Sequence, residues 1–321
     1  MIEPAARFSL NERRVYVAGH NGMAGAAIMR RLAGEGCALL TADRRAVDLR
    51  RQEETERLLE RLRPDVVVLA AARVGGIKAN NDFPVDFLAD NLAIQTNVLT
   101  ACHRVGVDRL LFLGSTCIYP RDAPQPMREE SLLTGPLEPS NQWYAIAKIA
   151  GLKLAQAYRR QYARHYISVM PTNLYGPGDN YHSEHSHVVA ALIRRFHEAK
   201  QAGDAAVTVW GTGTPRREFL YAGDFADACV FLLKTYDGEE PVNIGVGEDV
   251  SIAELARLVA DTVAYGGRIV YDPSKLDGTP RKLVDISRLS ALGWRARTPL
   301  RAGLALAYQH FLAEGANRRE V

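Results

Sequence analysis

The sequence predicts an α/β fold, with a doubly wound parallel sheet followed by a smaller, partly interleaved C-terminal α/β part. The first observation is that short apolar runs such as residues 65–72 (DVVVLAAA) alternate with stretches of helical periodicity through the first half. Strands that are apolar on both faces are typical of a parallel sheet covered by helices on both sides. The second observation is a glycine-rich turn between the first apolar run and the first helical stretch. Together these features favour a doubly wound sheet.

The elements of the first half follow this alternation in order. Each expected strand is a short apolar run, and the strands lie at residues 15–18, 38–42, 65–72, 110–114 and 167–170. Helices are expected from the glycine turn to about residue 35, and at residues 52–63, 83–105 and 143–162. Pro64 closes the second of these helices, because proline disfavours a helical conformation in the residue before it.

The rhythm of the sequence changes after Pro171. Residues 175–186 (YGPGDNYHSEHS) are rich in Gly, Asn and Ser, which predicts a loop. The expected elements that follow are a helix at 187–200, a strand at 207–210, a helix at 224–234 and two helical pieces after residue 289. Ser251 and Glu254 have the spacing of a capping box and predict one more helix start. We therefore expect one domain at 12–175 and a second at 176–321, with about 215–240 returning to the first and a cleft between them.

Composition excludes several classes of function. With 321 residues, 47% of them hydrophobic and 24% charged, the chain has the composition of a globular protein with a large core. A formal charge of +3 is close to neutral for this size, so neither a nucleic acid nor a membrane surface is expected as a partner. The N-terminus has no apolar run that would indicate a signal peptide.

The cysteines are widely separated in the sequence. They are Cys37, Cys102, Cys117 and Cys229, and they show no CxxC spacing. Such spacing indicates neither a disulfide framework nor a thiolate zinc site, so no metal is expected from them. A cytoplasmic location is therefore expected.

The glycine-rich turn predicts a dinucleotide site. The turn comprises Gly19, His20, Asn21, Gly22, Met23, Ala24 and Gly25. Glycines at this spacing allow a tight turn, close approach of the backbone to a pyrophosphate, and a helix N-terminus aimed at the anion. The position between a strand and a helix is the structural context that such a motif requires. The first domain is thus expected to be a dinucleotide-binding Rossmann domain, and the second a substrate domain.

The end of the second expected strand distinguishes NAD from NADP. An acidic side chain at this place binds the 2′-hydroxyl of NAD, whereas an arginine pairs with the 2′-phosphate of NADP. The chain offers both, with Asp43 followed by Arg44 and Arg45. The two arginines favour NADP, and Asp43 keeps NAD as an alternative.

A tyrosine–lysine pair predicts the chemistry. Tyr144 and Lys148 are four residues apart on an expected helix, so that both side chains lie on one face. A neighbouring ammonium and the positively charged nicotinamide of the cofactor are expected to stabilise the tyrosine phenolate, which can then exchange a proton with a carbonyl oxygen during hydride transfer. Ser115 follows the strand at 110–114 and is placed to hydrogen-bond the same oxygen, because ligands bind at the carboxyl ends of parallel strands.

The glycine turn, the strand-end serine and the tyrosine–lysine helix, in this order, resemble the extended short-chain dehydrogenase/reductase superfamily. Longer blocks are similar to the GDP-L-fucose synthase family in particular. They are GHNGMAG (19–25), AAARVGGIKANN (70–81), FLGSTCIYP (112–120), YAIAKIAG (144–151), MPTNLYGPGDN (170–180), SHVVAALIRRFHEA (186–199), VWGTGTPRREFL (209–220) and DGTPRKLVDISRLSALGW (277–294). The resemblance extends from Arg14 to about Leu312.

The resemblance implies a two-step reaction on GDP-4-keto-6-deoxy-D-mannose. The centres at C3 and C5 are inverted, and the C4 ketone is then reduced by NADPH. Inversion beside a ketone needs one group to remove a proton and another to return it on the opposite face. The resemblance gives these roles to Cys117 and His187, without deciding which acts at each carbon. It gives Tyr144 the role of proton donor in the reduction.

The resemblance also implies binding residues and a homodimer. The NADP-binding positions are the seven residues of the glycine turn together with Arg44, Asp48, Leu49, Leu113, Gly114, Ser115, Thr116, Lys148, Pro171, Thr172, Asn173, Leu174 and His187. The substrate-binding positions are Arg195, Trp210, Arg217, Asp277 and Lys282. Asn21 departs from the family, which commonly has arginine there, and this weakens the preference for NADP.

Several alternatives remain open on the sequence. His182, His185 and His187 form an H-x-x-H-x-H pattern, with Glu184 the nearest carboxylate, but the first shell of a metal is incomplete. Arg217 could pair with its neighbour Glu218 instead of binding substrate. A GDP-L-colitose synthase on the same scaffold and a catalytically inactive nucleotide-binding regulatory protein are the competing functions.

Overall fold

The computed structural model describes residues 8–183, 185–275 and 277–314. A six-stranded sheet forms its larger part, in the order β10-β5-β4-β3-β1-β2, with every neighbouring pair parallel. Its strands are β1 (Arg14–Ala18), β2 (Ala38–Leu40), β3 (Val66–Leu69), β4 (Arg109–Leu113), β5 (His165–Pro171) and β10 (Val242–Ile244). The predicted doubly wound parallel sheet is confirmed.

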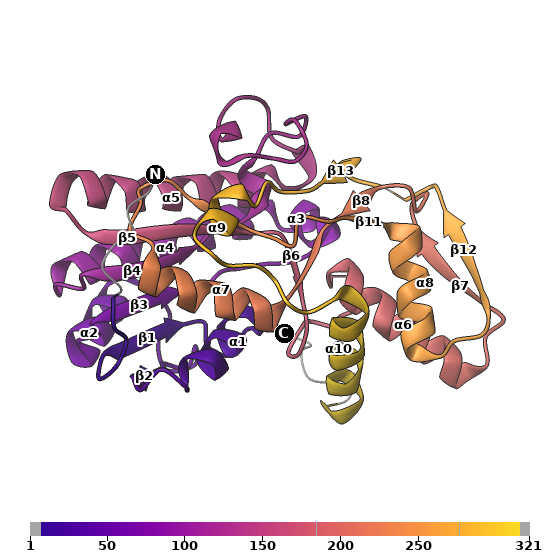
Figure 1. The fold of residues 1–321 in the computed structure, drawn as a ribbon, viewed down its shortest axis with the longest axis horizontal. Coiled ribbons are helices and arrows are strands. Elements are labelled where there is room, and N and C mark those ends of the chain that lie inside the picture. The colour runs from indigo at the N-terminus through magenta and orange to yellow at the C-terminus, as the bar shows by residue number, and fades with distance from the viewer. Residues whose placement is uncertain (1–7, 184, 276, 315–321) are drawn as a thin grey trace.

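Helices cover both faces of this sheet (Figure 1). One face carries α1 (Met23–Leu32) and α7 (Ala222–Thr235), and the other carries α2 (Gln52–Leu62), α4 (Pro84–Arg104) and α5 (Gln142–Tyr162). Alternate residues of β1 divide between the two cores: Val15 and Val17 pack with α1 and α7, while Tyr16 packs with α2 and α4. This two-sided burial is why most strand positions are apolar.

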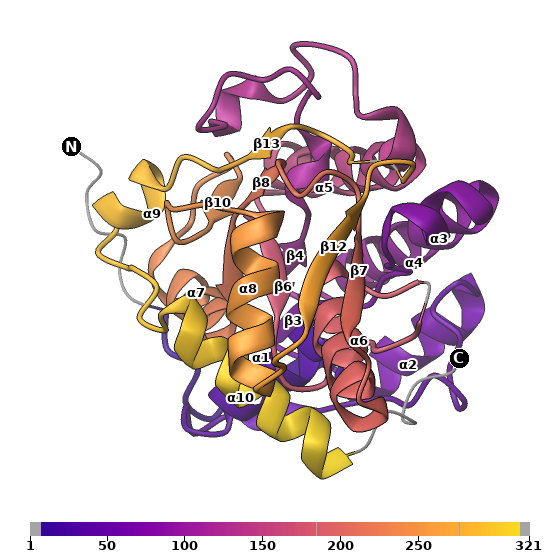
Figure 2. The ribbon, with the colours of Figure 1, turned by 90° about the vertical axis from the view of Figure 1, so that its right-hand side faces the viewer.

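A smaller part holds a third core beside the sheet (Figures 1 and 2). It is built from α6 (Val188–Ala202), α8 (Ile252–Val263) and α10 (Leu300–Glu314) around the parallel pair β7 (Ala206–Trp210) and β12 (Arg268–Asp272). The expected capping box opens α8, because Ser251 accepts from the Glu254 backbone N–H and the Glu254 carboxylate accepts from the Ser251 N–H.

Short elements connect the two parts. They are α3 (Ile77–Asp82), the parallel pair β6 (Asn173–Tyr175) and β9 (Phe219–Tyr221), the ribbon β11 (Val250–Ser251), β8 (Arg216–Arg217) and β13 (Arg281–Lys282), the helix α9 (Ser287–Ala291), and three 3₁₀ turns, η1 (Thr116–Ile118), η2 (Glu129–Ser131) and η3 (Pro139–Asn141). These elements were not predicted, apart from α9, which is the first of the two helical pieces expected after residue 289.

Two expected strands are shorter than predicted, and one helix ends early. The run at 65–72 forms a strand only as far as Leu69, because beyond it the chain leaves the sheet and approaches the glycine turn at Gly19. The second strand ends at Leu40, and α1 ends at Leu32. In the part of the chain that the structure describes, no helix has a long enough apolar stretch to cross a membrane.

Candidate active site

The glycine turn has the geometry of a pyrophosphate cradle. Gly19 has a φ of 86°, and a Cβ built on it would lie 2.6 Å from the Ala71 backbone nitrogen. A Cβ on Gly25 would lie 2.1 Å from the Gly19 carbonyl oxygen, so only glycine lets α1 pack so closely on the turn. Gly22 is the N-cap of α1 and has no side chain to occupy the helix N-terminus. The backbone is therefore open to an anion where the dinucleotide was predicted.

The segment after β2 separates the roles of Asp43 and Arg44. The Asp43 carboxylate accepts the Arg45 backbone N–H (2.7 Å), and its carbonyl oxygen accepts the Ala46 N–H (3.0 Å), so Asp43 closes a local turn. Arg44 is exposed. A carboxylate already engaged in its own turn is a weaker candidate for a ribose hydroxyl, which strengthens the case for an arginine on a 2′-phosphate.

Asp48 and Leu49, also expected beside the cofactor, lie in a network of polar contacts. A hydrogen bond from Arg50 lowers the pKa of the Asp48 carboxyl to about 2. The Leu49 carbonyl oxygen accepts from Asn97 (3.0 Å) and from the Thr55 hydroxyl (3.2 Å). These contacts fix the shape of the loop after β2.

Ser115 lies where β4 ends, as the sequence predicts. It is the N-cap of η1, and its Oγ accepts the Cys117 backbone N–H at 3.2 Å. Gly114, just before it, donates its N–H to the Val169 carbonyl, and a Cβ there would lie 2.3 Å from the Met170 side chain. The chain can thus turn sharply at the carboxyl edge of the sheet, with Leu113 and Thr116 buried on either side of the turn.

Tyr144 lies in the first turn of α5 and reaches Ser115. Interaction with the Ser115 side chain favours the phenolate, but burial has the larger effect and the nearby Cys117 adds to it, so the pKa of Tyr144 is raised. Lys148 does not meet the tyrosine hydroxyl directly: its Nζ donates to the Leu113 carbonyl (2.9 Å) and lies 5.7 Å from the centre of the tyrosine ring. The expected stabilisation of the phenolate by Lys148 is therefore not provided by the polypeptide alone, which holds Tyr144 protonated.

Cys117 is held from two sides. Its Sγ accepts a hydrogen bond from Asn141 Nδ2 at 3.3 Å, and Lys282 Nζ lies 3.8 Å away. The sulfur also interacts electrostatically with Tyr144 and with Arg217. The structure therefore brings Ser115, Cys117 and Tyr144 together, as the sequence suggested.

His187 lies on a different element from the other catalytic candidates. It is the N-cap of α6 and has an extended backbone, and the residue is exposed to solvent. The protein around its ring still removes enough water to lower the pKa of the imidazole by desolvation. The loop before it is fixed by the Gly76 backbone N–H, which donates to the His185 carbonyl at 3.2 Å. A lowered pKa keeps His187 neutral near pH 7, the form that can accept a proton.

The five expected substrate residues form two linked groups. Arg195 lies over the Trp210 ring, with its Cζ 4.3 Å from the ring centroid, and a Cβ on the next residue, Gly211, would lie 2.2 Å from the Asp277 carboxylate. Both carboxylate oxygens of Asp277 accept from Thr212, at 2.8 Å each. The predicted Asp277 contact to substrate therefore competes with a local cap on the loop after β7.

Arg217 and Lys282 form the second group. They are paired in register on the parallel strands β8 and β13, next to Cys117. Burial lowers the pKa of the Arg217 guanidinium, which donates to the Asp277 carbonyl at 3.4 Å and so joins the two groups. Two cations beside the Cys117 sulfur form a region suited to an anionic substrate.

Glu218 does not pair with Arg217, which removes one alternative. The Glu218 side chain is fully buried and accepts backbone N–H groups from Val246 (2.6 Å), Gly247 (2.7 Å) and Val284 (3.0 Å). Neighbouring residues of an extended strand point to opposite faces, so Arg217 faces Cys117 and Glu218 faces the scaffold. Burial raises the pKa of the Glu218 carboxyl.

Residues 171–174, also expected at the cofactor, lie at the end of β5 and just after it. Two of them donate hydrogen bonds to the backbone carbonyl of Glu218. The Asn173 amide donates to the Glu218 carbonyl oxygen at 2.8 Å, and the Thr172 hydroxyl donates to it at 3.3 Å. Pro171 ends β5 and Leu174 lies within β6. The strand that carries Arg217 is thus fastened to the expected cofactor edge.

Comparison with known proteins places the chain in a family. The model of the NAD dependent epimerase/dehydratase family matches residues 15–245, well over half of the chain. The chain belongs to the NAD dependent epimerase/dehydratase family.

Within this family the chain is similar to the GDP-L-fucose synthases, as the sequence blocks predicted. It is 54% identical to the GDP-L-fucose synthase of Sinorhizobium fredii, over 97% of this chain and 99% of that protein. It is 55% identical to GDP-L-fucose synthase 1 of Arabidopsis thaliana, over 95% of each. A solved GDP-L-fucose synthetase from Naegleria fowleri bound to NADP is 30% identical with a TM-score of 0.89, covering 98% of this chain and 99% of that one. Identity to the GDP-L-colitose synthase of Yersinia pseudotuberculosis is 35%, over 95% of this chain and 99% of that protein.

The histidine loop of this family member is arranged for local contacts. The rings of His182 and His185 stack at 4.7 Å, and the His185 backbone N–H donates to His182 Nδ1 at 3.2 Å. Across residues 8–183, 185–275 and 277–314, no three His, Cys, Asp or Glu side chains are grouped to hold a metal ion. Glu184, the carboxylate considered for such a site, lies outside the described residues.

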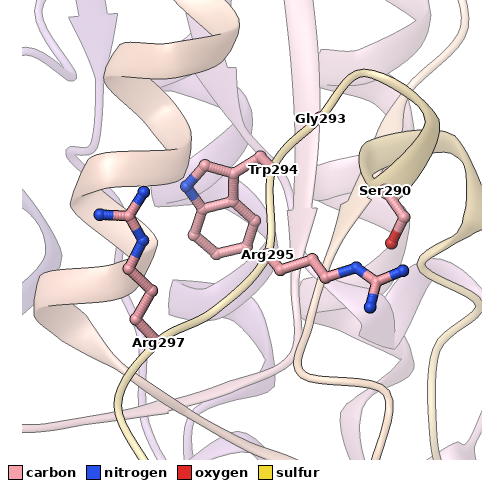
Figure 3. Close-up of a pocket in the computed structure, with 5 residues that line it drawn as sticks. All are labelled: Ser290, Gly293, Trp294, Arg295 and Arg297. Atoms are coloured by element: carbon pink, nitrogen blue, oxygen red, sulfur yellow. The ribbon is translucent and has the colours of Figure 1, made fainter.

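A surface pocket of this family member lies apart from these residues (Figure 3). It is lined by Ser290, Gly293, Trp294, Arg295 and Arg297. Arg295 extends toward Ser290, whereas Arg297 lies on the other side of the Trp294 indole (Figure 3). The indole N–H donates to Asp227 on α7 at 2.9 Å. The pocket thus lies where the segment between α9 and α10 is fastened to the sheet domain.

Proposed function

We propose that this protein converts GDP-4-keto-6-deoxy-D-mannose to GDP-L-fucose by epimerising C3 and C5 and then reducing the C4 ketone with NADPH. The observation that carries the proposal is the contact of Ser115, Cys117 and Tyr144 at the carboxyl end of β4. This contact places Cys117, which can exchange a proton with a ring carbon, beside Tyr144, which can donate a proton to the adjacent carbonyl oxygen. The high identity to GDP-L-fucose synthases along almost the whole chain supports the choice of substrate.

The cofactor is NADPH, which supplies hydride to C4 when bound. The residues present fit it, since Gly19 and Gly25 leave the backbone accessible to a pyrophosphate and Arg44 is exposed to meet a 2′-phosphate. The Asp43 carboxylate already accepts a hydrogen bond in its own turn, which disfavours NAD because NAD needs an acidic side chain for its 2′-hydroxyl. Lys148, anchored on Leu113 beside Tyr144, is placed for the nicotinamide ribose.

The chain's own residues carry the proton transfers. One of Cys117 and His187 removes the proton at C3 or C5, and the other returns a proton to the opposite face. The Ser115 and Tyr144 hydroxyls hydrogen-bond the C4 oxygen while it carries the negative charge of the enolate. In the reduction Tyr144, held protonated by burial, donates its proton to that oxygen as hydride reaches C4.

The GDP moiety is held by the cationic and aromatic groups along the cleft. Arg217 and Lys282 lie together on β8 and β13 and suit the diphosphate, which arginine can grip bidentately. Trp210 offers an exposed ring face to the nucleoside, with Arg195 stacked on the ring and Asp277 at the edge.

The chain is organised as a dinucleotide-binding domain over 12–175 and a substrate domain over 176–321, with about 215–240 returning to the first. Supporting this division, α7 packs against α1 on the central sheet, whereas α6, α8 and α10 share a separate core. The strand β10 at 242–244 also joins the central sheet, which supports extending the returning segment by a few residues.

The protein acts as a cytoplasmic homodimer. All four cysteines are unpaired, as expected in a reducing compartment. Exposed apolar side chains on the adjacent helices α4 and α5, namely Val85, Trp143, Ile146 and Tyr162, support a dimer contact on these helices. Sedimentation of the purified protein at micromolar concentration tests the oligomeric state.

The test of function is oxidation of NADPH and of NADH with GDP-4-keto-6-deoxy-D-mannose, followed by NMR of the product. GDP-L-fucose formed preferentially with NADPH supports the proposal. A 3-deoxy substrate turned over in preference would favour a GDP-L-colitose synthase, although identity to the colitose enzyme is much lower. No oxidation with any GDP-keto-deoxyhexose would favour a catalytically inactive regulatory protein.

A further inference from the structure

Asn141 has an unusual position at the start of α5. It is the N-cap residue of that helix, and asparagine is among the residues that most often cap a helix with their side chain. Here the side chain makes no capping hydrogen bond. Its amide turns instead to Cys117, with Nδ2 3.3 Å from the sulfur. The N-cap side chain of the helix that carries Tyr144 therefore contacts the Cys117 sulfur instead of the helix backbone.

The other atom of the same amide is also unusual. Asn141 Oδ1 is buried and has no hydrogen-bond partner among the described residues. An unpaired buried oxygen is unfavourable for stability, so it calls for an explanation in function. The two ends of an amide differ in one respect that matters here: the nitrogen donates hydrogen bonds and the oxygen accepts them.

The sulfur that Asn141 contacts needs both kinds of partner. A sulfur that has lost its proton accepts hydrogen bonds, and one that has gained a proton donates a weak one. With Nδ2 toward the sulfur, Asn141 serves the anion. With the amide turned over, the currently unpartnered Oδ1 would accept the S–H hydrogen.

The segment that carries Asn141 is fixed independently of the sulfur. The Glu138 carboxylate accepts from the Ser140 N–H (3.3 Å) and hydroxyl (3.1 Å), and from the buried Thr279 hydroxyl (3.1 Å). The Asn141 backbone N–H donates to the Glu138 carbonyl at 3.1 Å. The amide is therefore presented from a rigid turn that is tied to the 277–282 segment of the substrate domain.

We propose that Asn141 is a positioning residue for Cys117, whose amide holds the sulfur through its gain and loss of a proton during epimerisation. Lys282 Nζ, 3.8 Å from the sulfur, contributes charge from the other side. The inference rests on the proposed function, because it assigns Asn141 to the epimerisation step and not to the hydride step, which belongs to Tyr144.

Two variants separate this role from a structural one. Asn141→Ser keeps a good helix cap and cannot reach the sulfur, so a purely structural role predicts unchanged or higher thermal stability and full activity. Asn141→Asp keeps the shape, but it removes the donor and places a negative charge beside the sulfur. Gln142→Ala, a change at the neighbouring residue, is the matched control.

The readouts separate the two chemical steps. Epimerisation is measured by deuterium incorporation at C3 and C5 of GDP-4-keto-6-deoxy-D-mannose in D₂O. The hydride step is measured in reverse, by oxidation of GDP-L-fucose with NADP⁺. In Asn141→Ser we expect exchange to fall about 10-fold or more, as loss of a hydrogen bond to a charged group implies, with reverse oxidation within about twofold of wild type. Asn141→Asp should lose at least as much exchange, and Gln142→Ala should match wild type in both.

Alkylation by iodoacetamide provides a test without substrate. Mass spectrometry follows Cys117, with the half-buried Cys37 in the same digest as reference. Cys117 should react more slowly in Asn141→Asp, relative to Cys37, than in wild type. Exchange in Asn141→Ser within about twofold of wild type would overturn the inference, as would equal losses in both steps accompanied by a lower melting temperature. A wild-type protein that neither exchanges nor oxidises overturns the proposed function itself, and the alkylation rates then still decide whether Asn141 controls the sulfur.

Discussion

Lys148 is a buried charge without a carboxylate partner among the described residues, and replacing it with methionine is predicted to stabilise the protein. Its side chain is 4% exposed, and its Nζ donates to the Leu113 carbonyl at 2.9 Å. Burial lowers the pKa of this ammonium from 10.5 to about 8. At about 1.36 kcal/mol per pKa unit, that shift amounts to about 3 kcal/mol of unfavourable free energy at pH 7. Losing the charge-assisted hydrogen bond to Leu113 costs about 2 kcal/mol, so the variant should be more stable by about 1 kcal/mol.

The difference in the free energy of unfolding between Lys148→Met and wild type should depend on pH. The folded pKa of Lys148 lies below the unfolded value, so between pH 8 and 10.5 the unfolded chain holds the proton more often than the folded one. Wild-type stability therefore rises with pH through this window relative to Lys148→Met. The advantage of the variant should be largest below about pH 8 and should shrink toward pH 10.5.

Chemical denaturation of the cofactor-free protein at pH 7 and pH 9.5 measures both quantities. Lys153→Met is the control, because Lys153 lies exposed on the same helix and should give little stabilisation. A Lys148→Met variant less stable than wild type at pH 7 would refute the reasoning, and so would a stability difference that does not change with pH. The same variant should lose catalytic activity, since the buried lysine is retained for chemistry at the expense of stability.

The remaining predictions concern individual steps and contacts. Tyr144→Phe should reduce hydride transfer by about 100-fold or more while NADPH affinity, measured by fluorescence titration, stays within a few-fold; normal turnover would disprove the assignment. Cys117→Ser should suppress deuterium exchange at C3 and C5 far more than reverse oxidation of GDP-L-fucose, and undiminished exchange would exclude Cys117 from the epimerisation. Arg44→Ala should weaken binding of NADPH by about 10-fold or more and leave NADH unaffected, and equal effects on both would argue against a contact with the 2′-phosphate. Glu218→Gln should lower the free energy of unfolding by about 1–3 kcal/mol, because its amide meets a backbone N–H where a carboxylate oxygen accepted one; denaturation that matches wild type would contradict this.

The central sheet was predictable because its signal is local and repeated. Most strand positions are apolar on both faces, and β1, β2 and β3 are each followed by a helix. Strands such as β8, β11 and β13 have two residues each, which is too short for any periodicity. Their pairing joins residues tens of positions apart, and single-sequence patterns do not specify such contacts.

The residues of the site likewise divide into those that the sequence places and those that it does not. Ser115, Tyr144 and Lys148 could be placed because a strand end and a four-residue helical spacing determine where their side chains point. Asn141 was missed because its partner is 24 residues away and because an asparagine before a helix ordinarily indicates a cap. Had the start of α5 been predicted at Gln142 and not one residue later, Asn141 would have appeared as its N-cap, although its contact with sulfur would still not have followed.

Glu218 shows why a charged pair adjacent in sequence is a poor guide to contact in a strand. The sequence allowed Arg217 to pair with Glu218, yet the extended backbone sends them to opposite faces. Glu218 binds the backbone at Val246, Gly247 and Val284, and so fixes β8 against the segments on either side of it. A slip of one residue in β8 would exchange the two side chains, placing a carboxylate in the diphosphate region and an arginine among backbone N–H donors that it cannot accept from. The buried carboxylate therefore secures the register that keeps Arg217 beside Lys282, and its three N–H donors offset the burial that raises its pKa.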